Sequence, residues 1–223
     1  MNRVFIGFDE RETVAYHVLC QSILRHSTEP VSFTPLVLGQ LPMTRQREAL
    51  QSTDFAFSRF LVPWLCDYKG VALFMDCDML VTGDITDLFN ESNDRYAVQV
   101  VKHDHVPKET VKFLGQKQTA YPKKNWSSVM LFNNSMCQTL TPKYVNRASG
   151  LELHRFEWLH PGLVGEVPRE WNYLVGHDDY NEFSNLHYTT GGPWFEDYSG
   201  CPHADLWYRE KELMLEPCGE AVN

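Results

Sequence analysis

Asp76 and Asp78 are the residues of this sequence best suited to do chemistry. They stand one residue apart, directly after the apolar run Val71–Met75, which is typical of a buried strand. Side chains alternate along an extended backbone, so we expect both carboxylates to point to the same side. Two carboxylates on one side of a strand exit can bind one cation.

This acidic pair predicts a site for a divalent ion and a diphosphate. Mg²⁺ and Mn²⁺ prefer oxygen ligands and keep open positions for substrate phosphates. Without a cation, Asp76 and Asp78 would repel each other beside a buried strand, at a cost in free energy. When a sugar–phosphate bond breaks, negative charge develops on the departing oxygen, and a bound divalent ion lowers that barrier as a Lewis acid.

Segments with strand and helix character alternate over the first hundred residues. The predicted strands are Val4–Phe8, Val31–Leu38, Val71–Met75, Tyr96–Val101 and, further on, Trp126–Asn133. A helix before Pro30 is predicted from an apolar stripe at helical spacing, made of Tyr16, Leu19, Cys20, Ile23 and Leu24. Phe55–Leu65 also has a helical period, with a kink or a new helix start at Pro63, and Ile85–Phe89 predicts a single helical turn after Asp84.

This order predicts an α/β fold with a mostly parallel central sheet flanked by helices. The ligand crevice of such a fold lies beyond the carboxyl ends of its strands, so it would collect the loops after Phe8 and Met75. The polar, lysine-rich stretch from His103 to Tyr121 predicts a loop or lid, and the last third of the chain reads as irregular.

Aromatic residues and histidines are dense between His154 and Trp207. Examples are Trp158, His160, Trp171, His177, His187, Trp194, Phe195, Tyr198 and His203. Sugar rings stack on aromatic faces, so this region is a candidate acceptor wall; a loop-rich region that packs its own small core is an equally valid interpretation.

The segment from Val71 to Phe89 resembles the Asp-x-Asp region of glycosyltransferase family 8, the group of glycogenin and bacterial galactosyltransferases. Phe5-Ile-Gly-Phe-Asp-Glu-Arg11 is similar to that family's first strand and nucleotide-binding loop, and Ser58-Arg-Phe60 to its phosphate-contacting helix. His187-Tyr-Thr-Thr-Gly-Gly-Pro-Trp194 is similar to its His-Tyr/Phe-x-Gly-x-x-Lys-Pro-Trp element. Pro168-Arg-Glu-Trp-Asn-Tyr-Leu174 resembles its Leu-Pro-x-x-Trp-Asn stretch, which we interpret as structural.

The resemblance implies a single GT-A domain over 1–223, a Rossmann-like nucleotide-diphospho-sugar transferase. Residues 1–101 would form its nucleotide-sugar half, and 102–223 its acceptor half with a loop-rich C-terminal part. It implies Mn²⁺ or Mg²⁺ held by Asp76, Asp78 and His187, the two aspartates being catalytic. The residues implied to bind the donor are Gly7, Phe8, Asp9, Arg11, Arg59, Cys77, Ser127 and Gly191. The implied reaction transfers a hexose from a UDP-sugar to a hydroxyl of a carbohydrate or other acceptor, with retention.

Three departures from the family's pattern affect this assignment. The terminal element is one residue short and lacks its lysine, so Arg59, Arg11 or a lysine within Lys102–Lys124 would have to contact the phosphate instead. The family's Asn-Ala-Gly is replaced by Trp126-Ser-Ser128, which predicts a different donor-sugar pocket. Its Asp-Gln pair is missing, since no Gln follows Gln138.

The base that deprotonates the acceptor depends on the stereochemistry. With retention, the leaving phosphate oxygen itself can take the acceptor proton on the same face of the sugar. With inversion, a carboxylate must act as general base, and the candidates are Glu157, Asp178 and Asp179. We expect the other histidines, including His103 and His105, to be exposed and to bind no metal.

Bulk composition excludes several other classes of protein. Hydrophobic residues make up 43% and charged residues 22%, as in ordinary globular domains. The net charge of −9 argues against a nucleic-acid partner, which needs a concentrated basic face. The apolar runs are too short for a membrane span, and the N-terminus lacks a secretory signal. Six scattered cysteines without a Cys-x-x-Cys pair predict reduced thiols in the cytoplasm.

Two other functions use the same residues. In a phosphatase similar to the haloacid dehalogenases, Asp76 would be the nucleophile and Asp78 the general acid, with Mg²⁺. That class carries its motif near the start of the fold, whereas two strands precede it here; Lys143 and Asp178-Asp179 would have to complete the phosphatase site. A catalytically degenerate protein that binds nucleotide sugars would explain the missing Gln and Lys.

Overall fold

The computed structural model describes residues 1–47, 51, 53–104, 113–115 and 123–216. Its strands are β1 Asn2–Gly7, β2 Val31–Leu36, β3 Val71–Met75, β4 Met79–Val81, β5 Val98–Val100, β6 Val129–Asn133, β7 Val164–Glu166, β8 Tyr173–Leu174 and β9 Asn185–His187. Its α-helices are α1 Thr13–His26, α2 Val62–Leu65, α3 Ile85–Asn90, α4 Pro142–Arg147, α5 Gly150–His154 and α6 Ala204–Leu215.

A six-stranded sheet in the order β2-β1-β3-β6-β5-β7 forms the centre of the molecule. β1 pairs in parallel with β2 and β3, and β5 with β7, while β6 runs antiparallel to its neighbours β3 and β5. This arrangement confirms the predicted α/β fold with a mostly parallel sheet. A separate three-stranded sheet has the order β4-β9-β8. Its strand β4 follows β3 closely in the chain, whereas β8 and β9 come from residues 173–187.

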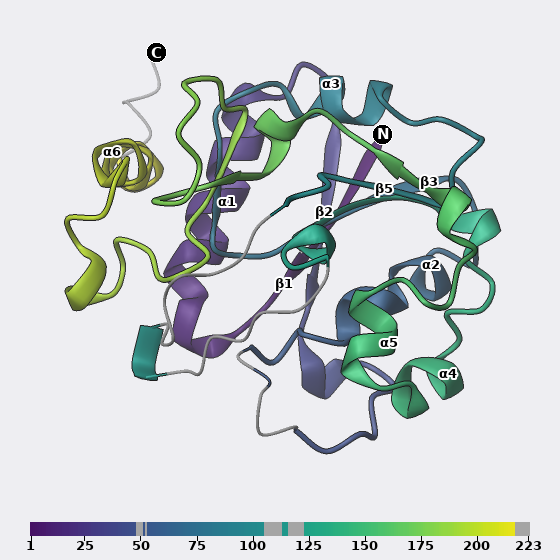
Figure 1. Cartoon of the computed structure of the whole chain (residues 1–223). Helices are drawn as coiled ribbons and strands as arrows, with labels where there is room; N and C mark the ends of the chain where they lie inside the picture. The colour runs from purple at the N-terminus through teal and green to yellow at the C-terminus, as the bar shows by residue number, and fades with distance from the viewer. Residues whose placement is uncertain (48–50, 52, 105–112, 116–122, 217–223) are drawn as a thin grey trace, which may run out of the picture.

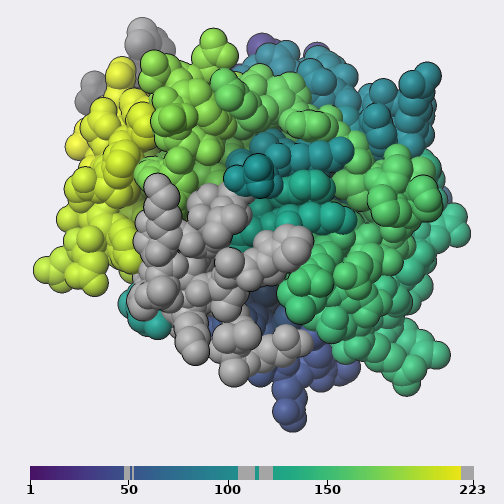
Figure 2. Space-filling view, in the orientation of Figure 1, coloured from purple at the N-terminus to yellow at the C-terminus, as the bar shows by residue number. Residues whose placement is uncertain are grey.

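The helices flank the central sheet in two groups. In Figure 1, α1 and α6 lie next to each other on one side, and α2, α4 and α5 gather on the other. In the space-filling view of Figure 2, the yellow surface of α6 and the green surface of residues 140–165 lie at opposite sides of the molecule. Among the described residues, no helix is long and apolar enough to cross a bilayer.

The main core lies between the central sheet and its helices. Strand β3 is almost wholly inside it, because Ala72, Leu73, Phe74 and Met75 are each 0% exposed. A second, smaller cluster joins α1 and α6 to the small sheet through residues such as Val18, Leu186 and Trp207. The chain therefore positions the loop after β3 between two packed bodies.

Several predicted boundaries were close, and some were wrong. Val71–Met75 is confirmed as a strand, and Pro63 starts a fresh helix, since it lies in the first turn of α2. The predicted strands from Val31, Tyr96 and Trp126 are shorter in the structure. The last of them begins only at Val129, because a 3-10 turn occupies Trp126–Ser128.

Two features of the helices correct the sequence interpretation. Leu24 is not part of the buried stripe of α1: it is 56% exposed, while Leu19 and Ile23 are fully buried. The last third is not wholly irregular either, because α6 forms a 12-residue helix there. This helix packs on α1, and its buried Glu210 receives hydrogen bonds from Arg25 at 2.6 to 3.0 Å.

The five described cysteines are free thiols; Cys218 lies outside the described residues. Most of the predicted loop or lid, residues 105–112 and 116–122, together with His105, also lies outside them.

Candidate metal and nucleotide site

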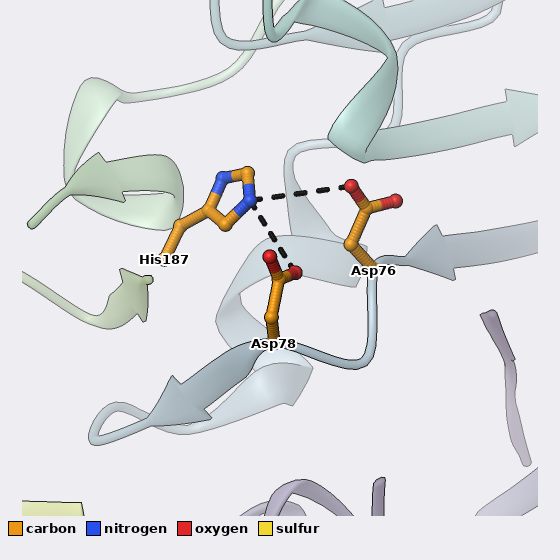
Figure 3. Close-up of side chains that lie close together, drawn as sticks. All are labelled: Asp76, Asp78 and His187. Carbon is orange, nitrogen blue, oxygen red and sulfur yellow. Dashed lines mark ion pairs between the residues drawn. The ribbon is translucent and has the colours of Figure 1, made fainter. Parts of the chain in front are cut away.

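Asp76, Cys77 and Asp78 form the link between the two sheets. Asp76 directly follows β3, and Asp78 directly precedes β4. The backbone from Asp76 to Asp78 was expected to be extended, but the chain bends at residues 77 and 78 as it leaves the large sheet. The predicted outcome for the carboxylates still holds: Asp76 and Asp78 both point toward His187, as Figure 3 shows.

Strand pairing brings His187 to this bend from more than a hundred residues away. β9 pairs antiparallel with β4, and Met79 is the partner of His187 in this register. The next residue, Tyr188, donates its backbone N–H to the carbonyl of Asp78 at 2.9 Å. The imidazole Nε2 consequently lies 3.4 Å from Asp78 Oδ1 and 4.0 Å from Asp76 Oδ2.

The three side chains fit a divalent cation. One ligand atom from each of Asp76, Asp78 and His187 lies within 4.8 Å of the other two. The side chains are 14%, 12% and 3% exposed, so the site is largely shielded from solvent. Two carboxylates and one imidazole form a donor set suited to Mn²⁺ or Mg²⁺, with positions left for substrate oxygens.

Arg59 forms an ion pair with Asp76 Oδ1, whereas His187 faces Asp76 Oδ2. Its guanidinium Nη1 lies 2.7 Å from Asp76 Oδ1 and donates to the carbonyl of Ser127 at 2.8 Å. The side chain is 6% exposed and stacks over Phe74 at 4.8 Å. Arg59 was predicted as a phosphate contact; in this structure it is buried and neutralises part of the charge of Asp76.

The loop after β1 lies at the same edge as the bend. Ile6 pairs with Met75, so Gly7 and Asp76 leave the sheet side by side. Asp9 is 2% exposed and accepts hydrogen bonds from Arg11 and from the backbone N–H of Asp54. Burial alone would raise the pKa of Asp9, but these hydrogen bonds outweigh it and lower the pKa below its ordinary value. Asp9 and Arg11 therefore brace the loop on which they stand.

Gly7 is required by packing in this structure. A Cβ at this position would lie 2.3 Å from the ring of Phe55, which is 1% exposed in the core. We expect Gly7→Ala to lower the free energy of unfolding by about 1–3 kcal/mol, because a buried ring must shift. Urea unfolding measures this. Gly39→Ala is the matched control, since nothing lies within 4 Å of its added Cβ; equal losses in the two variants would contradict the expectation.

Glu12 is a buried acid beside the site that the sequence analysis did not single out. Glu12 is 1% exposed, and neither of its carboxylate oxygens has a hydrogen-bond partner among the described residues. Burial raises the pKa of Glu12 well above its ordinary value, and the charges of Asp78, Asp9 and Asp76 raise it further, with Arg11 opposing them. In the metal-free protein Glu12 therefore keeps its proton to a higher pH than it does in the unfolded chain.

This raised pKa predicts a pH dependence of stability. Above about pH 4.3 the unfolded chain loses the Glu12 proton and the folded chain keeps it, so stability falls as pH rises toward the folded pKa. The contribution is up to about 1.4 kcal/mol per pH unit, and Glu12→Gln removes it. Urea unfolding in the presence of a chelator, compared between about pH 5 and pH 7, should show a steeper loss for the parent protein. Parallel pH dependences would refute this.

Ser127 and His154 form a close pair next to Arg59. Ser127 Oγ lies 2.7 Å from His154 Nδ1, and Ser127 is 4% exposed. Burial lowers the pKa of His154 well below its ordinary value, and the cations Arg59, Lys124 and Arg45 add to this effect. The segment Trp126-Ser-Ser128, which replaces the Asn-Ala-Gly of glycosyltransferase family 8, is thus held in place by a hydrogen bond between Ser127 and the neutral imidazole of His154.

The remaining predicted residues lie around the site in different ways. Cys77 is 0% exposed and belongs to the main core, where burial raises the pKa of its thiol well above the ordinary value. Phe8 is partly exposed and contacts Tyr16 edge to face at 5.5 Å. Gly191 has φ +154°, and a Cβ there would lie 2.7 Å from the ring of Tyr198.

One candidate base and three of the aromatic residues have structural contacts. Asp178 accepts from the backbone N–H of Leu174 at 2.7 Å and from Tyr180 Oη at 3.2 Å. Glu157 is exposed. Trp158, Trp171 and Trp207 are at most 7% exposed and belong to the two cores, which favours the core interpretation for these three.

Comparison with known proteins places the chain in a family. No protein-family model matches it. Over 222 residues it is 45% identical to Protein CDI of Arabidopsis thaliana, an alignment that covers 94% of this chain and 86% of that protein. The chain belongs to the Protein CDI family.

This member of the Protein CDI family has the fold of GT-A glycosyltransferases. WbbM, a bifunctional glycosyltransferase, superposes with a TM-score of 0.62 at 14% identity, covering 94% of this chain and 51% of WbbM. The glycosyltransferase GlyE of Streptococcus pneumoniae gives 0.60 at 17%, covering 96% and 61%. Galactosyltransferase LgtC, solved with donor and acceptor sugar analogs, gives 0.55 at 11%, covering 98% of both chains. The Protein CDI family member thus spans about half of WbbM and nearly all of LgtC.

Proposed function

We propose that this chain is a metal-dependent glycosyltransferase, related to glycosyltransferase family 8, that moves a hexose from a UDP-sugar to a hydroxyl of a carbohydrate or other acceptor. The observation that carries the proposal is the convergence of Asp76, Asp78 and His187 at the link between the two sheets of a GT-A fold. The structural neighbours WbbM, GlyE and LgtC are glycosyltransferases, and LgtC was solved with donor and acceptor sugar analogs.

The residues of the site take separate roles in this proposal. Asp76, Asp78 and His187 would hold a Mn²⁺ or Mg²⁺ ion, which would supply electrophilic stabilisation to a departing diphosphate. Arg59 fixes the orientation of Asp76 through its buried ion pair. We assign the loop of Gly7, Phe8, Asp9 and Arg11 to the nucleoside, because it leaves the sheet beside Asp76.

Around this centre we assign the backbone of Cys77, together with Ser127 and Gly191, to the donor. We assign 1–101 to donor binding and 102–223 to the acceptor side. The five free thiols fit a cytoplasmic setting, where we place the reaction.

We further propose that the reaction retains the anomeric configuration. Asp178, one of the three candidate bases, already accepts from the backbone of Leu174 and from Tyr180. Glu157 and Asp179, the other two, lie on the exposed surface. A phosphate oxygen on the leaving group is then the base for the acceptor hydroxyl, which requires attack from the face that the diphosphate leaves. The anomeric configuration of the product, read by NMR, tests this step.

Incubation of the protein with Mn²⁺ and a panel of nucleotide sugars tests the function. The expected result is release of a nucleoside diphosphate that stops when the metal is chelated. Release of inorganic phosphate from phosphomonoesters would favour the phosphatase instead. Calorimetric binding of UDP without turnover on any nucleotide sugar would show a degenerate binding protein, and both outcomes would overturn the proposal.

A further inference from the structure

Asn172 lies directly behind His187. It ends the 3-10 turn Arg169–Asn172 and is 0% exposed. Its Oδ1 lies 2.9 Å from His187 Nδ1, on the opposite side of the ring from the two aspartates. Its Nδ2 lies 2.9 Å from Ser128 Oγ and 3.2 Å from the carbonyl of Asn125. A fully buried amide thus joins three segments that are distant in sequence.

The hydrogen-bond network fixes which way this amide points. The carbonyl of Asn125 only accepts, so it requires the Nδ2 of Asn172 on its side. Ser128 Oγ donates to the same carbonyl at 2.6 Å, which leaves its lone pairs to accept from Nδ2. Oδ1 must therefore face His187, and an oxygen in that place requires a proton on Nδ1.

The orientation of Asn172 sets the chemistry on the other side of the imidazole ring. A neutral imidazole with its proton on Nδ1 carries its lone pair on Nε2. That lone pair faces Asp78 Oδ1 at 3.4 Å and Asp76 Oδ2 at 4.0 Å. Three electron-rich atoms facing one another are unfavourable alone and become favourable when a cation lies between them.

The same network reaches a second candidate ligand. The backbone carbonyl of Ser128, whose hydroxyl accepts from Asn172, in turn accepts the backbone N–H of Asp76 at 3.0 Å. Asn172 therefore contacts His187 directly and is linked to the backbone of Asp76 through one intervening residue. A substitution at Asn172 should therefore affect the positions of both His187 and Asp76.

We propose that Asn172 is a positioning residue that holds His187 in the Nδ1-protonated tautomer and so presents Nε2 as a metal ligand. The ligand part of this inference rests on the proposed function, whereas the tautomer part does not. The stretch around Asn172 was interpreted as structural from the sequence; the proposal gives it a defined role in metal binding.

The test combines ring NMR with metal affinity. Long-range ¹H–¹⁵N correlations of the metal-free protein, assigned with His187→Gln, report which ring nitrogen carries the proton. We expect Nδ1–H in the parent protein and its loss in Asn172→Leu. Calorimetry with Mn²⁺ should show about 10- to 100-fold weaker binding for Asn172→Leu. Asn172→Asp, which keeps an acceptor toward Nδ1, should recover most of the affinity.

Asn185→Leu is the matched control. Asn185 is also 0% exposed and lies two residues before His187, but its amide donates to the carbonyl of Trp171 at 2.8 Å. The substitution Asn185→Leu removes a buried amide that does not contact the imidazole of His187. The Nδ1–H signal should therefore remain, and Mn²⁺ affinity should change little. Equal losses of affinity in Asn185→Leu and Asn172→Leu would overturn the proposal.

The outcomes separate this inference from the proposed function. An Nε2–H ring in the parent protein overturns the role of Asn172 even if Mn²⁺ binds and nucleotide sugar is turned over. A parent protein with the Nδ1–H ring but without Mn²⁺ binding overturns the metal-dependent function and leaves the tautomer assignment supported. If Asn172→Leu does not fold, the parent spectrum and Asn172→Asp still decide the question.

Discussion

Asp78→Asn should lower the rate of nucleoside diphosphate release by about 1,000-fold, or ~4 kcal/mol of transition-state stabilisation. The amide keeps the size of the side chain but removes the charge that lies 3.4 Å from His187 Nε2. Mn²⁺ affinity, measured by calorimetry, should fall with the rate. Turnover of the preferred nucleotide sugar at saturating Mn²⁺ separates the loss of metal binding from the loss of catalysis.

Folding should survive this substitution. The pairing of β4 with β9 uses the backbone carbonyl of Asp78, which accepts from Tyr188, and not its side chain. Removing one of several close carboxylates also relieves repulsion in the metal-free protein. Asp87→Asn makes the same charge change on the exposed surface of α3 and should leave activity unchanged. A loss below tenfold for Asp78→Asn would remove Asp78 from the proposed site.

Arg59→Met should destabilise the protein by about 3–5 kcal/mol, because it leaves the carboxylate of Asp76 without its buried cation. The two charged atoms lie 2.7 Å apart, and the side chains are only 6% and 14% exposed. Urea unfolding of the metal-free protein measures the loss. The carbonyls of Ala56 and Ser127 also lose a hydrogen-bond donor, which adds to the cost.

A double-mutant cycle isolates the ion pair from these other losses. Asp76→Asn added to Arg59→Met should restore part of the stability, because the unpaired charge is gone, whereas the two carbonyls stay without their donor. Mn²⁺ should stabilise Arg59→Met more than the parent protein, since the ion replaces the missing positive charge beside Asp76. Additive effects of the two substitutions would show that the pair does not couple.

The strand β3, the aspartates that follow it and the helix α6 show what sequence patterns could and could not predict. Val71–Met75 was predicted to the residue, because an apolar run of only five residues next to polar residues favours a buried strand over a helix. The pair Asp76 and Asp78 followed from its place after that strand. The helix α6 was missed, since the charged run Arg209–Glu212 interrupts its apolar residues, and a helix of this length is stabilised largely by packing, here on α1.

His187 illustrates the limit more sharply. Only resemblance to a family suggested it, because a lone histidine in a strand of three residues carries no local signal. Its place depends on the register Met79↔His187, which joins residues 108 positions apart. The sequence did not predict a function for Glu12 or Asn172 for the same reason. The environment of a buried acid or a buried amide is set by neighbours from other segments of the chain.

Taken alone, the sequence determined local matters: it located β1, β2, β3, β5 and β6, it showed that two carboxylates follow β3, and it predicted the α/β fold. It did not predict the small sheet of β4, β8 and β9. The tertiary structure decided which residues meet. It bent the Asp76–Asp78 link between two sheets, placed Arg59 against Asp76 and set Asn172 behind His187. The physical reason is that apolar periodicity is a property of neighbouring residues in the chain, whereas charge pairing, tautomers and metal geometry depend on atoms brought together by packing.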